Sequence, residues 1–283
     1  MKEYTVKTVQ IGRGEAIAYR EAGSGPAVLL IHGNMSSSVH WQTVIAALEG
    51  THKVYAPDMR GFGDSTYNAP FDSLGDLALD MEEFAKAVGL GEFTVVGWSA
   101  GGGVALELAA LLPGCKKVVL INSVPVTGYP MFKKDAQGGP VLTEPLKTKE
   151  DVAADPVQVV PVLDALANNN REFMRFVWDN SIFAAVKPPA ADYEAYLDAT
   201  MKQRCLVDTN YALLTFNITG RLAGIKAEIV MIQGGQDVVV PLAWAQKSHE
   251  DTPGSRLLIF DNWGHSPITD DPGAFFDVLR REV

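Results

Sequence analysis

The sequence predicts an α/β protein with a mostly parallel, eight-stranded sheet flanked by helices. Apolar runs without polar alternation, such as Ala27–Ile31, are typical of strands buried on both faces of a parallel sheet. These runs alternate with helical patterns through short loops, which favours right-handed crossovers and a doubly wound sheet. The alternation stops at Val124 and resumes after Leu222, so a long insertion interrupts the sheet.

The first six strands of the predicted sheet precede that insertion. Two β-rich runs, Tyr4–Gln10 and Ala16–Glu21, are separated by Gly12-Arg13-Gly14, which is typical of a hairpin turn. From there strands and helices alternate. The expected strands are Ala27–Ile31, Lys53–Ala56, Phe93–Val96 and Lys117–Ile121, and the expected helices are Trp41–Leu48, Leu74–Val88 and Gly102–Leu112.

The insertion and the last part of the sheet follow. Residues 124–222 carry helical patterns rich in large aromatic side chains, and Gly128–Pro145 has the glycine, proline and lysine content of a surface loop. We therefore expect a core domain of residues 1–123 and 223–283, with a helical cap of residues 124–222 inserted after the sixth strand. The expected elements after the cap are the strands Ile229–Ile232 and Arg256–Phe260 and the helices Leu242–His249 and Pro272–Arg281.

The composition is that of an ordinary globular chain, since 47% of its 283 residues are hydrophobic and 20% are charged. A net charge of −10 argues against a nucleic-acid binder and disfavours docking on an anionic membrane. The N-terminus lacks the apolar stretch of a signal peptide, and no run approaches the roughly 18 apolar residues of a membrane span. With only Cys115 and Cys205, in unrelated segments, we expect a cytoplasmic protein without disulfides or stable membrane association.

The turn Gly97-Trp98-Ser99-Ala100-Gly101 is the strongest chemical motif in the sequence. It lies between a buried strand and a helix, which is the context that a G-x-S-x-G nucleophile elbow requires. The glycines relieve the crowding of a sharp turn, and the turn exposes the serine hydroxyl beside a helix N-terminus. We expect Ser99 to be a nucleophile.

A serine hydroxyl needs a base, and the base needs a carboxylate that fixes its tautomer. His265 follows the last predicted strand, and Asp237 follows the strand Ile229–Ile232. Because the carboxyl ends of parallel strands meet at one edge of the sheet, we expect both side chains to lie near Ser99. The chain order Ser, Asp, His is the order of an α/β-hydrolase triad.

Attack on a carbonyl also requires N–H donors for the oxyanion. We expect one from Ala100, which follows the nucleophile, and one from Asn34 in the loop after Ala27–Ile31, with Met35 as the alternative. No pair among the five histidines has metal-ligand spacing, so we expect no metal. The run Gly101-Gly102-Gly103 lacks the Lys-Ser/Thr of a phosphate loop, and we expect no cofactor.

Together these motifs resemble the α/β-hydrolase superfamily from about Gly14 to the C-terminus. The residues that carry the resemblance are His32-Gly33-Asn34, Asp58–Ser65, the elbow, Gln236-Asp237 and Gly264-His265-Ser266. The resemblance implies that the cap is a lid and that the Asp58–Ser65 loop braces the site through Arg60. Dehalogenases and epoxide hydrolases have an aspartate where this chain has Ser99, so their reactions are set aside. His32 is followed by a single glycine, whereas HGGG-type lipases have several.

The function we expect is cofactor-independent hydrolysis of a small-molecule carboxylic ester through an acyl-enzyme on Ser99. The apolar cap and the absence of a basic funnel favour an uncharged acyl group of small to medium size. The residues expected to line its pocket are Met35, Trp98, Phe132, Trp178 and Tyr211. The sequence leaves the natural substrate and the oligomeric state open.

Several other activities use the same catalytic groups. Lactone opening, carbon–carbon bond hydrolysis and perhydrolysis stay open on this sequence. The loop His32–Ser38 and Trp98 are similar to those of bacillus-type intracellular poly(3-hydroxybutyrate) depolymerases, which adds depolymerisation of that polymer. A ligand receptor without catalytic activity is an alternative from another class, because this fold also serves as a binding scaffold.

Overall fold

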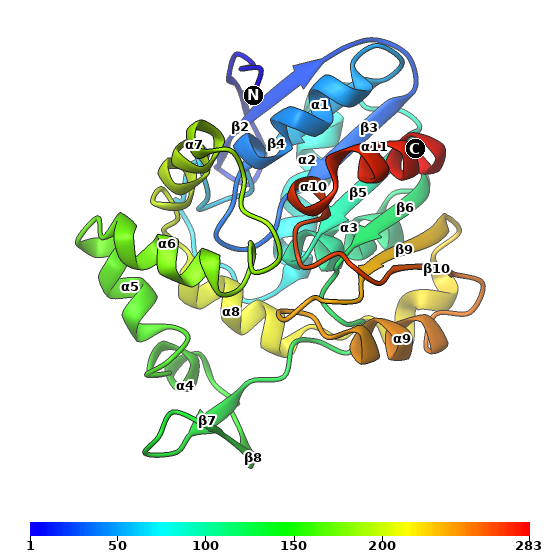
Figure 1. Cartoon of the computed structure of the whole chain (residues 1–283). Coiled ribbons are helices and arrows are strands. Elements are labelled where there is room, and N and C mark those ends of the chain that lie inside the picture. Colours follow the sequence, from blue (N-terminus) through cyan, green and yellow to red (C-terminus); the bar gives the residue numbers. More distant parts are fainter.

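The computed structural model describes residues 1–283 and contains one eight-stranded sheet, in the order β1-β2-β4-β3-β5-β6-β9-β10 (Figure 1). β2 pairs antiparallel with β1 and with β4, and every other pairing is parallel. This confirms the expected mostly parallel sheet. Its strands are β1 (Lys7–Gln10), β2 (Ala16–Ala22), β3 (Ala27–Ile31), β4 (Lys53–Pro57), β5 (Phe93–Trp98), β6 (Cys115–Ile121), β9 (Glu228–Gly234) and β10 (Arg256–Phe260).

Helices cover both faces of the sheet, and the apolar strands supply a core to each face. In β3, Leu29 and Ile31 belong to one buried cluster, and Val28 and Leu30 belong to the other. Alternate side chains of a strand point to opposite faces, so an unbroken apolar run is what such a position requires. α2 (Leu74–Ala87) and α3 (Ala100–Leu111) pack in the first cluster, whereas α1 (Gln42–Leu48) and α11 (Pro272–Glu282) pack in the second.

The insertion after β6 is mostly helical and gathers on one side of the molecule, at the left of Figure 1. Its helices are α4 (Lys149–Ala153), α5 (Val160–Ala167), α6 (Arg171–Asp179), α7 (Ala190–Thr200) and α8 (Leu206–Thr215). The segment expected as a surface loop contains two short antiparallel strands, β7 (Phe132–Lys134) and β8 (Pro140–Pro145). The division of the chain into a core and a cap domain at residues 124 and 222 stays a prediction.

The remaining differences from the expected elements are small. β1 begins at Lys7 rather than Tyr4, because the Tyr4 N–H leaves the sheet and donates to the Gln42 side chain at 3.0 Å.

The remaining elements are η1 (Ser38–Trp41), η2 (Thr219–Gly224), α9 (Leu242–Glu250) and α10 (Pro267–Asp270). None of the helices has both the length and the apolar character that crossing a bilayer demands.

A buried histidine joins η1 to the insertion. The His40 ring stacks on Trp178 of α6 and Tyr196 of α7, at centroid distances of 5.3 and 4.5 Å. His40 Nδ1 accepts a hydrogen bond from the Ser37 N–H at 3.2 Å, while Nε2 is buried without a partner. Burial of the ring lowers the pKa of His40 to about 3, because the charged imidazolium would lose its hydration.

This pKa makes the fold sensitive to acid. The unfolded chain binds a proton at His40 below its ordinary pKa of 6.5, whereas the folded chain resists that proton down to about pH 3. The burial of neutral His40 therefore costs no stability above pH 6.5. As the pH drops toward 3, it lowers the free energy of unfolding by at most about 1.4 kcal/mol per pH unit. In His40→Gln, which retains a Ser-x-x-Gln capping box, we expect a flatter dependence of the unfolding free energy on pH. Urea unfolding from about pH 4 to pH 7 measures it, and an unchanged slope would contradict this reading.

Candidate active site

Ser99 occupies a strained turn between β5 and α3. Its backbone has φ 55° and ψ −121°, a conformation that residues other than glycine rarely adopt. The turn brings the backbone of β5 against the start of α3. A Cβ at Gly97 would lie 2.4 Å from the Gly101 carbonyl oxygen, and a Cβ at Gly101 would lie 2.3 Å from that of Ile31. Both glycines are therefore required by close approach, and the motif folds as the elbow that its sequence predicts.

His265 and Asp237 form a buried pair at the same edge of the sheet. His265 Nδ1 lies 2.8 Å from Asp237 Oδ2, and both side chains are fully buried. Asp237 Oδ1 accepts hydrogen bonds from the N–H groups of Val239 and Val240 at 2.8 and 2.9 Å. Because the carboxylate binds Nδ1–H, the neutral ring presents Nε2 as an acceptor. Nε2 has no hydrogen-bond partner, and it is the free nitrogen that could take a proton.

Asn122 and Trp98 hold the segment that carries His265. Neither side chain had this role in the sequence-based expectations. Asn122, at the end of β6, donates to the Gly264 carbonyl at 2.8 Å and accepts from the Gly234 N–H at 2.8 Å. Trp98 donates its ring N–H to the His265 carbonyl at 2.9 Å. Asn122 thus ties the segment before His265 to the end of β9, and Trp98 ties it to the elbow. A polar residue directly after a buried strand is the sequence signal that could have identified Asn122.

The peptide between Gly33 and Asn34 has a fixed orientation. His32 Nε2 accepts from the Met59 N–H at 3.0 Å, so the neutral ring carries its proton on Nδ1, which lies 2.8 Å from the Gly33 carbonyl. The Ser36 hydroxyl donates to the same carbonyl at 2.7 Å. In a trans peptide the N–H points opposite to the C=O, so the Asn34 N–H is directed away from His32 and Ser36.

The Asn34 N–H makes no hydrogen bond within the protein, whereas the Met35 N–H is already bonded to the Asn34 side chain at 2.9 Å. This geometry favours Asn34 over Met35 as a donor to a ligand. Ala100 is the first residue of α3, where a backbone N–H has no partner within the helix. The dipole of the helix favours negative charge at the same point.

One further carboxyl group lies beside the pair. Asp270, at the end of α10, accepts from the Gly264 N–H at 2.7 Å through Oδ2, while its Oδ1 has no hydrogen-bond partner. Burial raises the pKa of Asp270 to about 6. No sequence pattern indicated Asp270, because its approach to Gly264 depends on the turn of α10.

A cavity of about 310 Å³ opens beside Ser99, and its lining includes no charged side chain. Thirteen of the eighteen lining residues are hydrophobic. Ser99, Asn34 and Met35 line it from the core, and α5, α6 and α8 contribute Val162, Val177, Leu206, Asn210 and Leu213. The other lining residues are Val124, Tyr129, Met131, Val157, Gln158, Ser181, Ile182, Val238, Val239 and Val240.

Of the five residues expected to line the pocket, Met35 does so and four do not, which corrects the expectation. Trp98 is not among the lining residues; its ring is buried edge-on against Trp41 and donates to the His265 carbonyl. Trp178 is buried within the insertion, between His40 and Phe183.

The other two corrections concern the outer part of the insertion. Phe132 lies in β7, half-buried in the hairpin. Tyr211 lies on α8, where its ring faces the Lys149 ammonium at 5.9 Å. The insertion fills its own interior with aromatic side chains, so smaller aliphatic residues are left to line the cavity.

The structure contains neither a metal-binding cluster nor a reactive thiol. No group of three or more His, Cys, Asp or Glu side chains is arranged to hold a metal ion. Cys115 and Cys205 are unpaired and buried, and burial raises the pKa of each thiol to about 12.

Known proteins share the sequence pattern and the fold of this chain. A family model described as the alpha/beta hydrolase family matches residues 28–278. An uncharacterised protein of Mycobacterium bovis is 30% identical over 93% of this chain and 77% of its own length. The pimeloyl-[acyl-carrier protein] methyl ester esterase of Nitrosomonas europaea is 27% identical over 93% of this chain and 99% of its own. The solved esterase of Exiguobacterium antarcticum has the same fold, with a TM-score of 0.78, 22% identity and 98% of each chain covered.

The close packing at the elbow gives a stability prediction. Gly101→Ala would place a methyl group 2.3 Å from the Ile31 oxygen and 2.5 Å from the His32 oxygen, so the backbone has to move. We expect a loss of about 1–3 kcal/mol in unfolding free energy, measured by urea unfolding. Gly91→Ala is the matched control, because a Cβ there meets nothing within 4 Å. Equal stability of the two variants would contradict the close approach.

Proposed function

Since the chain belongs to the alpha/beta hydrolase family, we propose that it hydrolyses carboxylic esters through an acyl-enzyme on Ser99. The observation that carries the proposal is the buried His265–Asp237 pair, whose ring presents an unpartnered Nε2 at the sheet edge of the Ser99 elbow. The Nitrosomonas europaea relative, which is named as a methyl ester esterase, also supports it.

The reaction then runs in two stages. His265 Nε2 takes the Ser99 proton as the hydroxyl oxygen attacks the ester carbonyl, and Asp237 stabilises the resulting imidazolium. Collapse of the tetrahedral intermediate breaks the bond to the alkoxy oxygen, which leaves as the alcohol with the proton from His265. Water repeats the sequence on the acyl-enzyme and releases the carboxylic acid. The N–H groups of Asn34 and Ala100 stabilise the oxyanion in both stages.

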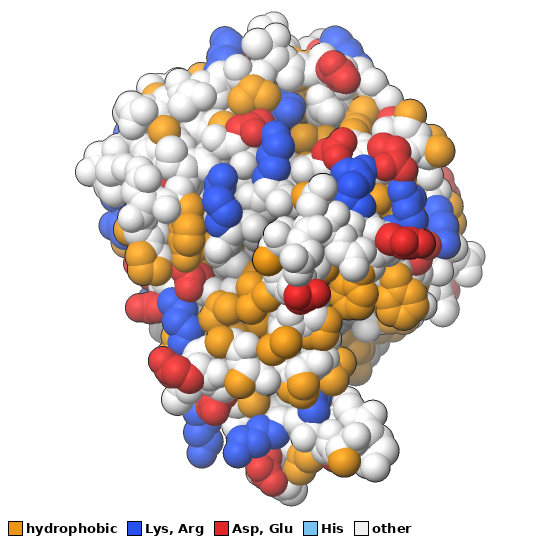
Figure 2. All heavy atoms as spheres, turned by 90° about the vertical axis from the view of Figure 1, so that its left-hand side faces the viewer, with side chains coloured by type: hydrophobic (Ala, Val, Ile, Leu, Met, Phe, Trp, Pro, Cys, Tyr) orange, Lys and Arg blue, Asp and Glu red, His pale blue; other side chains and the backbone are white.

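The cavity suggests the class of acyl group. An ionised acyl group would have to give up its hydration without a counter-charge, because no charged side chain lines the cavity. Val157 and Val238, which also line the cavity, are 46% and 61% exposed, so apolar surface continues to the outside. Figure 2 shows hydrophobic side chains gathered on the face that carries the insertion. We infer an uncharged, mainly apolar acyl group of small to medium size, covered by residues 124–222 acting as a lid.

The first test addresses the nucleophile. A fluorophosphonate should label Ser99 stoichiometrically in the wild-type protein. Because the groups act as a unit, Ser99→Ala and His265→Ala should each lower kcat for a p-nitrophenyl ester by on the order of 10⁴–10⁶, and Asp237→Asn by about 10⁴. Circular dichroism and urea unfolding check that the variants are folded. A folded wild-type protein that neither labels nor turns over esters would favour the ligand-receptor alternative.

The second test addresses the acyl group. We compare neutral p-nitrophenyl esters of increasing acyl length with an ester of matched length that ends in a carboxylate. The neutral ester should have the larger kcat/KM by at least about tenfold, because burying the unpaired carboxylate would cost more than 1.4 kcal/mol. Preference for the charged ester would contradict the inferred acyl class while leaving the role of Ser99 intact.

A further inference from the structure

Met35 has a strained backbone conformation. Its φ is 55°, in the left-handed region that an L-residue with a long side chain rarely enters. Met35 lies directly after Asn34, whose N–H is the oxyanion donor proposed above. His32 and Ser36 hold the Gly33 carbonyl on one side of that donor, so the strained residue on its other side has to be held by groups outside the loop of residues 33–35.

The insertion supplies the partners that hold this loop. Gln203, in the linker of residues 201–205 between α7 and α8, accepts from the Met35 N–H at 3.1 Å through Oε1. Its Nε2 donates to Asn34 Oδ1 at 2.8 Å. Thr200, the last residue of α7, donates its hydroxyl to the Met35 carbonyl at 2.7 Å. Both backbone polar groups of Met35 are thus bonded to the insertion.

These contacts are buried and oriented. Gln203 is only 5% exposed, so an amide atom that lost its partner there would be left without water to replace it. Asn34 Oδ1 accepts from both Gln203 and the Met35 N–H, which closes a ring of hydrogen bonds around the turn. An apolar side chain of the same length at position 203 would fill the space but leave this ring open.

The linker is itself fixed to the core. The Arg204 N–H donates to the Gly61 carbonyl at 2.9 Å, and the Cys205 thiol lies 3.7 Å from the Arg60 carbonyl. Asp208 at the start of α8 accepts from the Phe71 N–H at 3.2 Å. The linker and α8 therefore rest on the loop of residues 58–71.

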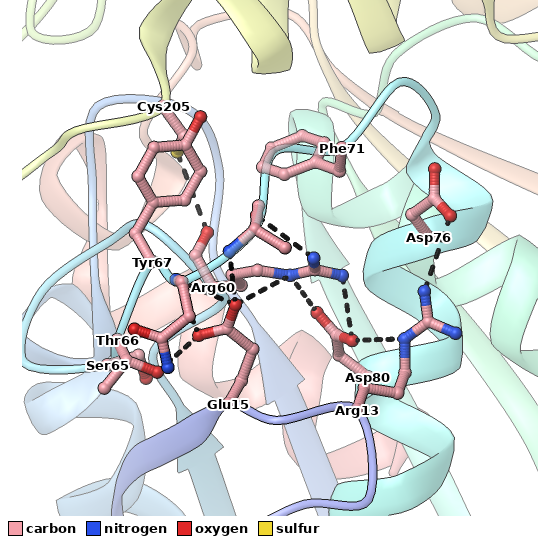
Figure 3. Close-up of polar contacts among 12 residues, drawn as sticks. Arg13, Glu15, Arg60, Ser65, Thr66, Tyr67, Phe71, Asp76, Asp80 and Cys205 are labelled. Atoms are coloured by element: carbon pink, nitrogen blue, oxygen red, sulfur yellow. Dashed lines mark hydrogen bonds and ion pairs between the residues drawn. The ribbon is translucent and has the colours of Figure 1, made fainter.

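That loop is in turn held by a buried ion pair and by a buried carboxylate, both drawn in Figure 3. Arg60 binds Asp80 through two nitrogens, at 2.8 and 3.0 Å. Glu15 accepts from the Asn68 and Ala69 N–H groups at 2.9 and 3.0 Å. A continuous set of contacts thus leads from the core, through the loop of residues 58–71, to Gln203 and the loop of residues 33–35.

We propose that Gln203 is a positioning residue, through which the insertion holds the loop of residues 33–35 in the conformation that directs the Asn34 N–H toward the oxyanion. The proposal rests on the proposed function for its catalytic consequence, but the contact itself does not. The lid then does more than cover the cavity, because its placement on the core completes the oxyanion site. Displacement of the linker would leave Ser99, His265 and the hydrogen bonds of the Gly33 carbonyl in place, while the Asn34 donor would lose its support on the Met35 side.

The test uses the full-length protein with Gln203→Met, which retains the length of the side chain and removes both polar atoms. Gln203→Glu is the conservative variant, because it retains an acceptor for the Met35 N–H. Thr209→Val is the matched control, since the Thr209 hydroxyl is buried in the same insertion but bonds only to Cys205 and to no group of residues 33–35. Hydrogen exchange of the Met35 amide is followed by NMR, in parallel with kcat, KM and inhibition by a trifluoromethyl ketone.

In Gln203→Met we expect faster exchange of the Met35 amide, and a kcat lowered by on the order of 10- to 100-fold with KM nearly unchanged. The ketone, whose adduct with Ser99 carries an oxyanion, should lose affinity by the factor by which kcat/KM falls. Gln203→Glu should recover part of both effects, and Thr209→Val should show neither. A lower kcat with an unchanged KM distinguishes a loss of positioning from a general destabilisation of the protein.

Two results would overturn the proposal. Unchanged exchange of the Met35 amide in Gln203→Met would show that the insertion does not hold the loop, whether or not the protein is an esterase. Faster exchange with unchanged kcat and ketone affinity would show that the contact has no catalytic consequence. Failure of the proposed function would be distinct from both, since the wild-type protein itself would then show no ester turnover.

Discussion

The structure of this site depends on the close approach of the chain to itself at Ser99. β5 ends and α3 begins within a turn so tight that Gly97 and Gly101 have no room for a Cβ. That turn forces Ser99 to φ 55° and places its hydroxyl at the carboxyl edge of the sheet, next to the free N–H groups of α3. Because the strain is local, the surrounding sheet has to hold it, and parallel pairing of β5 with β3 and β6 does so.

Around this turn, the remaining groups are positioned by hydrogen bonds from neighbouring segments. Asn122 and Trp98 hold the loop that carries His265, His32 and Ser36 hold the Gly33–Asn34 peptide, and Gln203 bonds to the loop beyond it. Most of these bonds end on backbone carbonyl or N–H groups. Asn122, for example, bonds both the Gly234 N–H of β9 and the Gly264 carbonyl, so it places the loop of His265 relative to the sheet. The site is therefore preorganised by its surroundings and not by its own few residues.

The sequence was sufficient to predict the sheet and the order of the loops that carry Ser99, Asp237 and His265. Ala27–Ile31 was predicted with its bounds unchanged, because a strand buried on both faces has to be apolar throughout. The pocket was harder to predict. Large aromatic residues such as Trp178 fill the interior of the insertion, and their hydrophobicity alone does not say which surface they face. The contact of Gln203 with Asn34 spans 169 positions in the chain, so only the three-dimensional packing of the insertion reveals it.

In the proposed reaction, Ser99 carries the acyl group between the two stages of ester hydrolysis. Mixing the protein with a p-nitrophenyl ester, quenching in acid within the first turnover and measuring the intact mass tests this most directly. If Ser99 is acylated, the mass increases by one acyl group, peptide mapping locates the adduct at Ser99, and one equivalent of nitrophenol is released. Release of nitrophenol without an adduct, or an adduct on another residue, would contradict it.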